Sequence, residues 1–229
     1  ANNAQAILLA SNGPDTQVAT IEQYAKEGVK FIYVDSPANT EAFQTLATDN
    51  KAAGQLAGET MLNKLTEMGV AEGKIGIVNV NSSTTSTQLR EEGFRAAFEG
   101  TKFEILETQY GEGQVAASQT IAENYITQGV VGIFGANEGS TTGTGNAIKE
   151  SGKDVVGVGF DQSDAILQLV DEGALLATMA QNPYVMGYQG VLSAVSVLQG
   201  KEIVGDKNYD TGVTVVDKAY IAEKGLLAK

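Results

Sequence analysis

Short apolar runs alternate along this chain with segments in which apolar residues recur every three or four positions. The apolar runs predict strands at 4–12, 31–35, 74–81, 102–110, 130–137, 154–160, 175–181 and 211–216. The periodic segments predict helices at 15–29, 51–68, 84–99, 114–128, 140–151, 163–172 and 184–199, with a short helix at the C-terminus. Regular alternation of this kind predicts an α/β fold with parallel sheets flanked by helices.

Two places interrupt the alternation. Residues 36–50 form a longer and more polar segment than a usual strand-to-helix loop, and we expect no strand there. In Gln181-Asn182-Pro183, the proline favours an extended backbone at Asn182. Both places suit crossings between two lobes. The predicted lobes are residues 1–49 plus 182–210, and residues 50–181 plus 211–229.

Five of the apolar runs stop at a polar side chain. In an open parallel sheet the carboxyl ends of the strands lie along one edge, and ligands bind there. Carboxylate and amide groups gathered at that edge suit a neutral ligand with many hydroxyl groups. The five residues are Asp35, Asn81, Asn137, Asp161 and Gln181.

Each candidate also has a purely structural interpretation. Asp35 and Asp161 could be helix caps or turn residues, which are frequent roles of aspartate. Phe160 favours ligand binding at Asp161, because an aromatic ring can pack on the C–H face of a sugar whose hydroxyls donate to the carboxylate. Arg90 is either a solvated helix residue or a guanidinium fork for ligand oxygens. Asn81 begins a glycosylation sequon, to which we assign no function.

The composition removes several kinds of chemistry. The 229 residues include no Cys and no His, which excludes Ser-His-Asp and Cys-His hydrolases, disulfides and zinc-thiolate sites. Catalysis by carboxylates alone or with Mg²⁺ stays open, although carboxylates adjacent on a helix, such as Glu91 and Glu92, point apart and suit a solvated surface. The glycine-rich segment 135–152 lacks the third glycine of a dinucleotide loop, with Ile148 in its place. Composition therefore leaves an enzyme open, and the expectation of a binding protein with no catalytic residue, metal site or cofactor rests on a family resemblance.

The net charge of −13 at pH 7 disfavours binding to nucleic acids and to anionic lipid surfaces. No stretch approaches the ~20 apolar residues of a membrane span, so we expect no membrane insertion by this chain. No signal peptide is visible in the opening ANNAQAILLA, which is compatible with a processed or cut chain.

Several segments together resemble the sugar-binding proteins of ABC transporters, in the ribose-binding-protein-like group. The most specific is VVGVGFDQSDAILQLVDEGALLATMAQNPYVMGYQGV, in which a GFD turn precedes a helix, a G-x-L-x-A-T-x-A-Q strand and P-x-x-x-G. Further matches are YVDSPAN, TDNKAAGQLAGE, REEGFRAAF and FGANEGSTTGTGNAIKESGK. The resemblance covers essentially the whole chain. It implies the two-lobed periplasmic-binding-protein type I fold, which the LacI-type regulators share, with a monosaccharide bound in the interlobe cleft.

The resemblance also implies which residues contact the ligand. Phe160 matches a ring-packing position, and Ser11 matches a position that approaches the ligand. Two positions depart from relatives: Ser36 stands where ribose binders often have Arg, and Gly113 stands where some have an aromatic residue. These departures leave the identity of the sugar, pentose or hexose, open. The implied hydroxyl-binding residues are Asp35, Arg90, Asn137, Asp161 and Gln181.

Family members begin with a strand, helix, strand and helix that precede the segment matching AQAILLASN. Their absence here implies a truncated chain with an incomplete N-terminal lobe. Part of the ligand clamp is then missing, and we expect weak or no sugar binding. Micromolar or tighter binding by calorimetry would contradict this expectation.

The function implied is that of a periplasmic or extracellular solute-binding protein, lipid-anchored in some full-length forms, which delivers sugar to the membrane subunits of an ABC permease. One alternative is the effector-sensing domain of a LacI-type regulator, which an upstream helix-turn-helix would reveal. A second is an enzyme acting on sugars or phosphosugars, which a turnover assay with Mg²⁺ would test.

Overall fold

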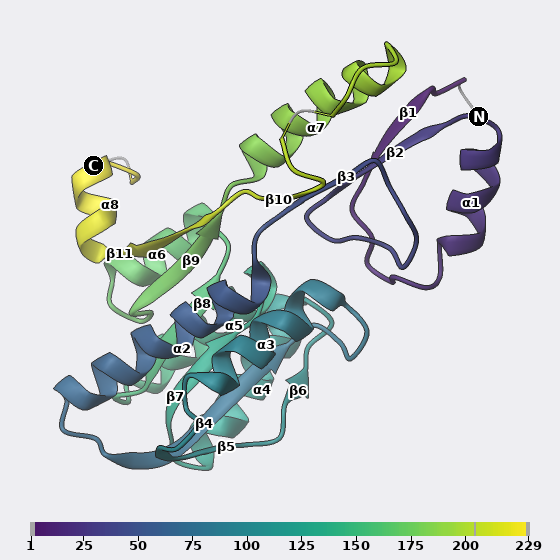
Figure 1. Cartoon of the computed structure of the whole chain (residues 1–229). Helices are drawn as coiled ribbons and strands as arrows, with labels where there is room; N and C mark the ends of the chain where they lie inside the picture. The colour runs from purple at the N-terminus through teal and green to yellow at the C-terminus, as the bar shows by residue number, and fades with distance from the viewer. Residues whose placement is uncertain (1–2, 204, 228–229) are drawn as a thin grey trace. The chain divides into compact units, whose positions relative to one another are not determined.

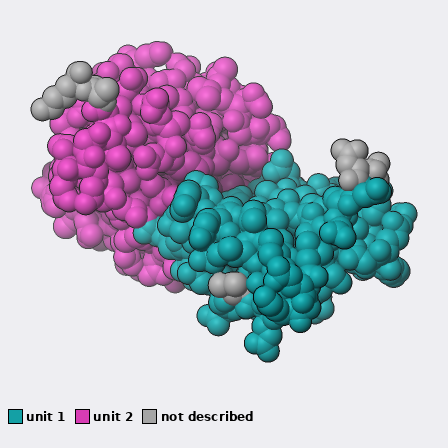
Figure 2. Space-filling model, turned by 90° about the horizontal axis from the view of Figure 1, so that it is seen from above, with its two compact units in different colours: residues 1–49, 83–86, 182–213 teal, residues 50–82, 87–181, 214–229 magenta. Residues whose placement is uncertain are grey.

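The computed structural model describes residues 3–203 and 205–227, which form two compact units (Figure 1). Unit 1 comprises residues 1–49, 83–86 and 182–213, and unit 2 comprises residues 50–82, 87–181 and 214–229 (Figure 2). The chain passes between the units after Asp49, around residues 83–86, after Gln181 and after Val213. The identification of these units with an incomplete N-terminal lobe and a C-terminal lobe stays a prediction.

Unit 1 contains a four-stranded parallel sheet in the order β1-β2-β3-β10. Side chains alternate across this sheet, as expected of a strand buried on both faces. In β2, Phe31 and Tyr33 pack with Ile21 of α1, whereas Ile32 packs with Ala194 of α7. The elements are β1 (Ala6–Leu9), β2 (Lys30–Val34), β3 (Gln44–Ala47), β10 (Asn208–Asp210), α1 (Val18–Lys26) and α7 (Pro183–Leu198).

Two strands of unit 1 lie where the sequence predicted none. Strand β3 occupies the end of the polar segment 36–50, and β10 lies in the tail before the predicted last strand. Both strands are short. Among their residues, only Leu46 of β3 is large, apolar and fully buried. Such short runs carry too few apolar positions for their period to be visible. Pairing with β2 therefore decides the conformation of β3, and pairing with β3 decides that of β10.

Unit 2 contains a sheet in the order β11-β9-β8-β7-β4-β5, with β6 also paired to β4. The pairs β4–β5, β4–β6, β4–β7, β7–β8 and β8–β9 are parallel. The predicted strand 102–110 is divided into β5 and β6. The strands are β4 (Glu72–Asn79), β5 (Lys102–Ile105), β6 (Gln109–Tyr110), β7 (Val130–Gly135), β8 (Val156–Phe160), β9 (Ala177–Gln181) and β11 (Val213–Asp217). The helices are α2 (Asn50–Glu67), α3 (Thr85–Ala96), α4 (Val115–Thr127), α5 (Glu138–Ser151), α6 (Asp164–Asp171) and α8 (Lys218–Lys224).

The two faces of this sheet are covered by different helices. Along β4, Gly76 adjoins the ring of Tyr125 on α4, whereas Asn79 hydrogen-bonds to Glu91 on α3. The neighbouring strand β7 also contacts a helix through a glycine, since Gly132 adjoins Met61 on α2. Helices α2 and α3 therefore cover one face, and α4 and α5 cover the other.

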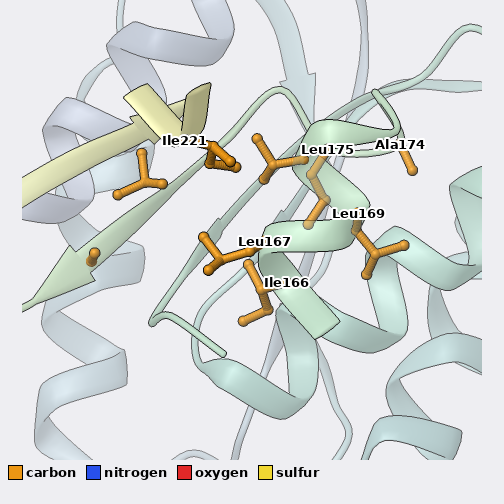
Figure 3. Close-up of a cluster of buried hydrophobic side chains, with 9 residues drawn as sticks. Ile166, Leu167, Leu169, Ala174, Leu175 and Ile221 are labelled. Carbon is orange, nitrogen blue, oxygen red and sulfur yellow. The ribbon is translucent and has the colours of Figure 1, made fainter. Parts of the chain in front are cut away.

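A separate apolar cluster fixes α6 and α8 beside β9. Ile166, Leu167 and Leu169 of α6 pack with Leu175 and with Ile221 of α8 (Figure 3). Ser163 caps α6 by accepting a hydrogen bond from the backbone N–H of Ile166. The cluster also includes Ala180 of β9, so it anchors the carboxyl end of that strand to α6 and α8.

Helices α2 and α3 cross in unusually close contact. A Cβ atom added at Gly54 would lie 2.0 Å from the carbonyl oxygen of Arg90, and one at Gly93 would lie 1.9 Å from that of Lys51. Only glycine fits such contacts. The crossing brings the first turn of α2 to the middle of α3.

Candidate functional site

Asp161 follows β8 directly and has a left-handed backbone, with φ 73°. This conformation is uncommon for residues with a side chain, and Asp and Asn tolerate it best. Its N–H donates to the carbonyl oxygen of Met179 at 3.0 Å, and its own carbonyl oxygen accepts from Thr178 Oγ1 at 2.8 Å. Neighbouring strand β9 therefore fixes the backbone that turns this side chain away from the strand.

The carboxylate of Asp161 is held by two donors. Its Oδ1 accepts from Gln181 Nε2 at 2.6 Å, and its Oδ2 accepts from the backbone N–H of Glu138 at 2.9 Å. Glu138 begins α5, whose positive N-terminal end favours a nearby anion. Each carboxylate oxygen has a second lone pair, so the group can still accept from ligand hydroxyls.

Asn137 is the N-cap of α5, where its Oδ1 accepts from the backbone N–H of Ser140 at 3.0 Å. The structural and the ligand-binding interpretations are compatible here, because capping uses the oxygen and leaves Nδ2 as the donor for a ligand. A Cβ atom added at Gly113 would lie 3.2 Å from this Nδ2. Gly113 therefore leaves space beside the amide of Asn137.

Arg90 is not a solvated helix residue, since it is only 2% exposed. Its Nε donates to Asn50 Oδ1 at 2.8 Å, and its Nη1 donates to the carbonyl oxygen of Ala136 at 3.0 Å. Ala136 directly precedes Asn137, so the guanidinium lies at the same end of the sheet as the cap of α5. These bonds fix the group in one plane.

Phe160 has a different role from the predicted one. Its side chain is fully buried, with the guanidinium of Arg90 4.2 Å from the ring centroid and Phe134 against it edge-on. Strand alternation explains this, because Gly159 faces Thr141 of α5 and Phe160 therefore faces α3. We correct the expectation of a sugar-packing ring: Phe160 supports Arg90 instead.

In unit 1, Asp35 repeats the backbone of Asp161. It follows β2 with φ 63°, and its N–H donates to the carbonyl oxygen of Leu46 in β3 at 2.9 Å. Its Oδ2 lies 2.9 Å from the hydroxyl of Ser36, which is 4% exposed and also 3.1 Å from the hydroxyl of Ser86. Asp35 is thus a partly buried carboxylate on a fixed backbone.

Ser11 lies beside this strand end and is 2% exposed. Its N–H donates to the carbonyl oxygen of Ser36 at 2.8 Å, and its hydroxyl donates to that of Gly13 at 3.1 Å. The structure therefore places Ser11 with Asp35 in unit 1. It brings Arg90, Asn137, Phe160, Asp161 and Gln181 together in unit 2.

Sequence reasoning missed the groups that hold these side chains. The supporting roles of Asn50 and of the backbone N–H of Glu138 become apparent only in the folded structure. The motif around Asn50 indicated a helix start but no contact with Arg90. Asn81 stays without an assigned role, and its carbonyl oxygen accepts from Gln88 at 3.1 Å.

The expectation for Glu91 is wrong, because this side chain is only 14% exposed. Its carboxylate accepts from Arg95 Nε at 2.9 Å, from Thr108 at 2.6 Å and from Asn79 at 2.8 Å. The network joins α3 to β4 and to the segment before β6. The network stabilises the packing of these elements and contains none of the predicted ligand-binding residues.

Within residues 3–203 and 205–227, no group of three or more Asp and Glu side chains is arranged to hold a metal ion. No helix in this described part of the chain combines the length and the apolar character that crossing a membrane requires.

Residues 1–202 match the family described as periplasmic binding protein domain. A ribose import binding protein from Haemophilus influenzae is 27% identical over 226 residues, which cover 86% of this chain and 76% of that protein. The ribose import binding protein of Escherichia coli is 29% identical over 196 residues, which cover 84% of this chain and 61% of that protein.

Solved structures show the same similarity. An ABC transporter solute-binding protein from Agrobacterium vitis with bound D-fucose is 32% identical with a TM-score of 0.90, and the match covers 97% of this chain and 78% of that one. A carbohydrate transporter solute-binding protein from Agrobacterium radiobacter, in complex with D-arabinose, is 28% identical with a TM-score of 0.89 over 97% of this chain and 77% of that one.

Proposed function

Because the chain belongs to the periplasmic binding protein domain family, we propose that it is the solute-binding part of an ABC sugar importer and binds a monosaccharide. The observation that carries the proposal is the pair Asp35 and Asp161. Each is a carboxylate directly after a strand, held on a left-handed backbone by a bond to the next strand. The choice of ligand class is supported by the similar ribose import binding protein and by the similar solute-binding proteins with bound D-fucose and D-arabinose.

The proposed contacts follow from the donors and acceptors at each strand end. Asp35 and Asp161 accept from sugar hydroxyls, and Asn137 donates through Nδ2. Gln181 and Arg90 donate to ring or hydroxyl oxygens, while Ser11 stays a candidate in unit 1. The family serves in transport, so the proposed contacts would hold a sugar without breaking a bond in it.

We propose a pentose or hexose without a charged substituent. The strand-end groups combine carboxylates with neutral amides and one arginine, so they offer acceptors and donors without a net positive site for a phosphate. The family is periplasmic. We further propose that the protein delivers its sugar to permease subunits and is attached to the membrane by a lipid anchor.

A monosaccharide panel tests this function. Isothermal calorimetry and thermal-shift assays would compare D-ribose, D-allose, D-arabinose, D-fucose and D-glucose, with mannitol as an acyclic control. The titration should reach millimolar sugar, because a Kd of about 1 mM still corresponds to about −4 kcal/mol. Both weak binding and no binding would fit a truncated lobe, and we propose weak binding: at least one cyclic sugar should bind in the millimolar range and raise the melting temperature. Absence of any response across the panel would contradict the proposal.

A further inference from the structure

We propose that Asn50 is a positioning residue that holds the guanidinium of Arg90 in the orientation needed for sugar binding. The inference rests on the proposed function and extends it to a residue outside the predicted ligand contacts. Asn50 begins α2 and is 6% exposed, and its Oδ1 accepts from Arg90 Nε at 2.8 Å.

Arginine needs such positioning because its long side chain has many rotamers, and fixing them costs conformational entropy. A guanidinium that is already fixed loses less freedom when a ligand binds. In this protein Asn50 fixes the Nε edge, the carbonyl oxygen of Ala136 fixes Nη1, and the ring of Phe160 fixes the plane. Asn50 is the only one of these three supports whose contact with Arg90 is made by a polar side chain.

The backbone explains why Asn50 can reach. Gly54 lies one turn after Asn50 on α2, and a Cβ there would lie 2.0 Å from the carbonyl oxygen of Arg90 itself. The glycine contact therefore brings the start of α2 against the turn of α3 that carries Arg90. Asn50, Gly54 and Arg90 all belong to unit 2, so the support does not depend on unit 1.

Because the hydrogen bond between Asn50 and Arg90 is buried, Arg90 depends on this particular acceptor. Because Arg90 is 2% exposed, water cannot easily replace a lost acceptor, and an unpaired N–H of a buried charged group is costly. Asn50→Ala removes the acceptor, and we expect the guanidinium to leave its plane. Asn50→Asp keeps an oxygen at the same place and should restore the bond.

The first measurement needs no sugar. In ¹⁵N-labelled protein, the Nε–Hε signal of Arg90, assigned by its loss in Arg90→Lys, should show slow solvent exchange and a high order parameter. We expect faster exchange and lower order in Asn50→Ala, and recovery in Asn50→Asp. Asn63→Ala is the matched control, since Asn63 lies on the same helix with an exposed side chain. An unchanged Arg90 signal in Asn50→Ala would overturn the inference, whatever the protein binds.

The second measurement is affinity for the sugar selected by the panel. We expect Asn50→Ala to weaken binding about tenfold or more, with recovery in Asn50→Asp and no change in Asn63→Ala. Thermal melts separate this effect from lost stability, because a purely structural role would lower the melting temperature of Asn50→Ala without changing the affinity of the folded protein. Wild-type affinity in folded Asn50→Ala would overturn the inference while leaving the proposed function intact.

Discussion

At the scale of single residues, Asp35 and Asp161 share one construction. Both leave a strand with positive φ, and both donate their N–H to the strand that follows in the sheet. Substitution by alanine would combine loss of the carboxylate with backbone strain, because alanine tolerates this conformation poorly. Asparagine tolerates it better, but it replaces one carboxylate oxygen with an NH2 donor and so removes the charge and one acceptor.

Asp161→Asn therefore tests the carboxylate without adding backbone strain. We expect a loss of sugar affinity of about tenfold or more, since a hydrogen bond to a charged group contributes about 1.5–3 kcal/mol. Calorimetry measures the affinity of the folded protein, and a urea melt should show a loss of about 1–3 kcal/mol in stability, because asparagine can accept from only one of Gln181 and Glu138. Asp164→Asn on exposed Asp164 of α6 is the control. Equal affinities of Asp161→Asn and the wild type would remove Asp161 from the binding site.

Tyr125 gives a prediction about pH. Burial raises the pKa of its hydroxyl from 10.0 to about 12, and the group lies 2.5 Å from the carbonyl oxygen of Glu107 and 3.1 Å from that of Ile77. The folded protein thus holds this proton more tightly than the unfolded chain does. The resulting stability is fully present below pH 10 and is lost as the pH rises toward 12, by about 2–3 kcal/mol.

Urea unfolding at several pH values between 9 and 12 measures this loss. Tyr125→Phe should lose less stability over that range than the wild type, although it should be less stable at neutral pH by about 1 kcal/mol. Tyr110→Phe, at a side chain that is 44% exposed, is the control and should follow the wild type. Parallel curves for Tyr125→Phe and the wild type would contradict the assignment.

At the scale of elements, the crossing of α2 and α3 positions Arg90, so it should be sensitive to added volume. Gly93→Ala would place Cβ 1.9 Å from the carbonyl oxygen of Lys51. Backbone cannot move aside cheaply, and we expect a loss of about 2 kcal/mol or more in the free energy of unfolding, measured by urea melts.

Gly187→Ala provides the opposite case. Gly187 lies within α7, and an added Cβ meets no atom within 4 Å. Alanine should stabilise the helix there by up to about 1 kcal/mol. If both glycine substitutions gave the same change, the close crossing would not be the cause of the Gly93 effect.

The elements also show how far sequence reasoning reaches. Long periodic segments such as 51–68 and strands such as 130–137 are recognisable because many apolar positions repeat. Strand β3 is not, because four residues that alternate in burial carry little signal and their conformation depends on β2.

The same limit applies to the site. The strand-end polar residues could be found by position, but the burial of Phe160 and the bond between Asn50 and Arg90 depend on which face of the sheet each helix covers. The orientation of Phe160 follows from the alternation of side chains along β8. Gly159 faces α5, so the next residue must face away from α5. The contact of Asn50 depends on the helix crossing and has no local signature.

At the scale of the whole molecule, α7 has an unusual surface. One face is buried on the sheet of unit 1, whereas apolar side chains on the other face follow spacings of four and three residues. Tyr184 and Tyr188 stack there with ring centroids 5.9 Å apart. We call this face the α7 stripe. It consists of Tyr184, Tyr188, Val191, Leu192, Val195 and Leu198, which are 38–75% exposed.

An exposed apolar stripe should bind an apolar dye such as ANS. We expect the double variant Val191→Gln, Val195→Gln to bind less dye with almost unchanged stability, because both side chains are about half exposed (54% and 46%). Ala194→Gln, at a residue that is 6% exposed on the same helix, should instead destabilise the protein by about 1–3 kcal/mol. Undiminished dye fluorescence in the double variant would place the apolar surface elsewhere.

We propose that the polar residues at the strand ends together bind a monosaccharide. The most direct measurement is a ¹H–¹⁵N NMR titration of the 229-residue chain with the sugar that the panel selects. We expect the largest shift changes at the backbone amides of Asn137, Glu138, Asp161 and Gln181, with Asp35 and Ser36 in unit 1 also affected. Shift changes confined to other surfaces, or none at saturating sugar, would contradict it.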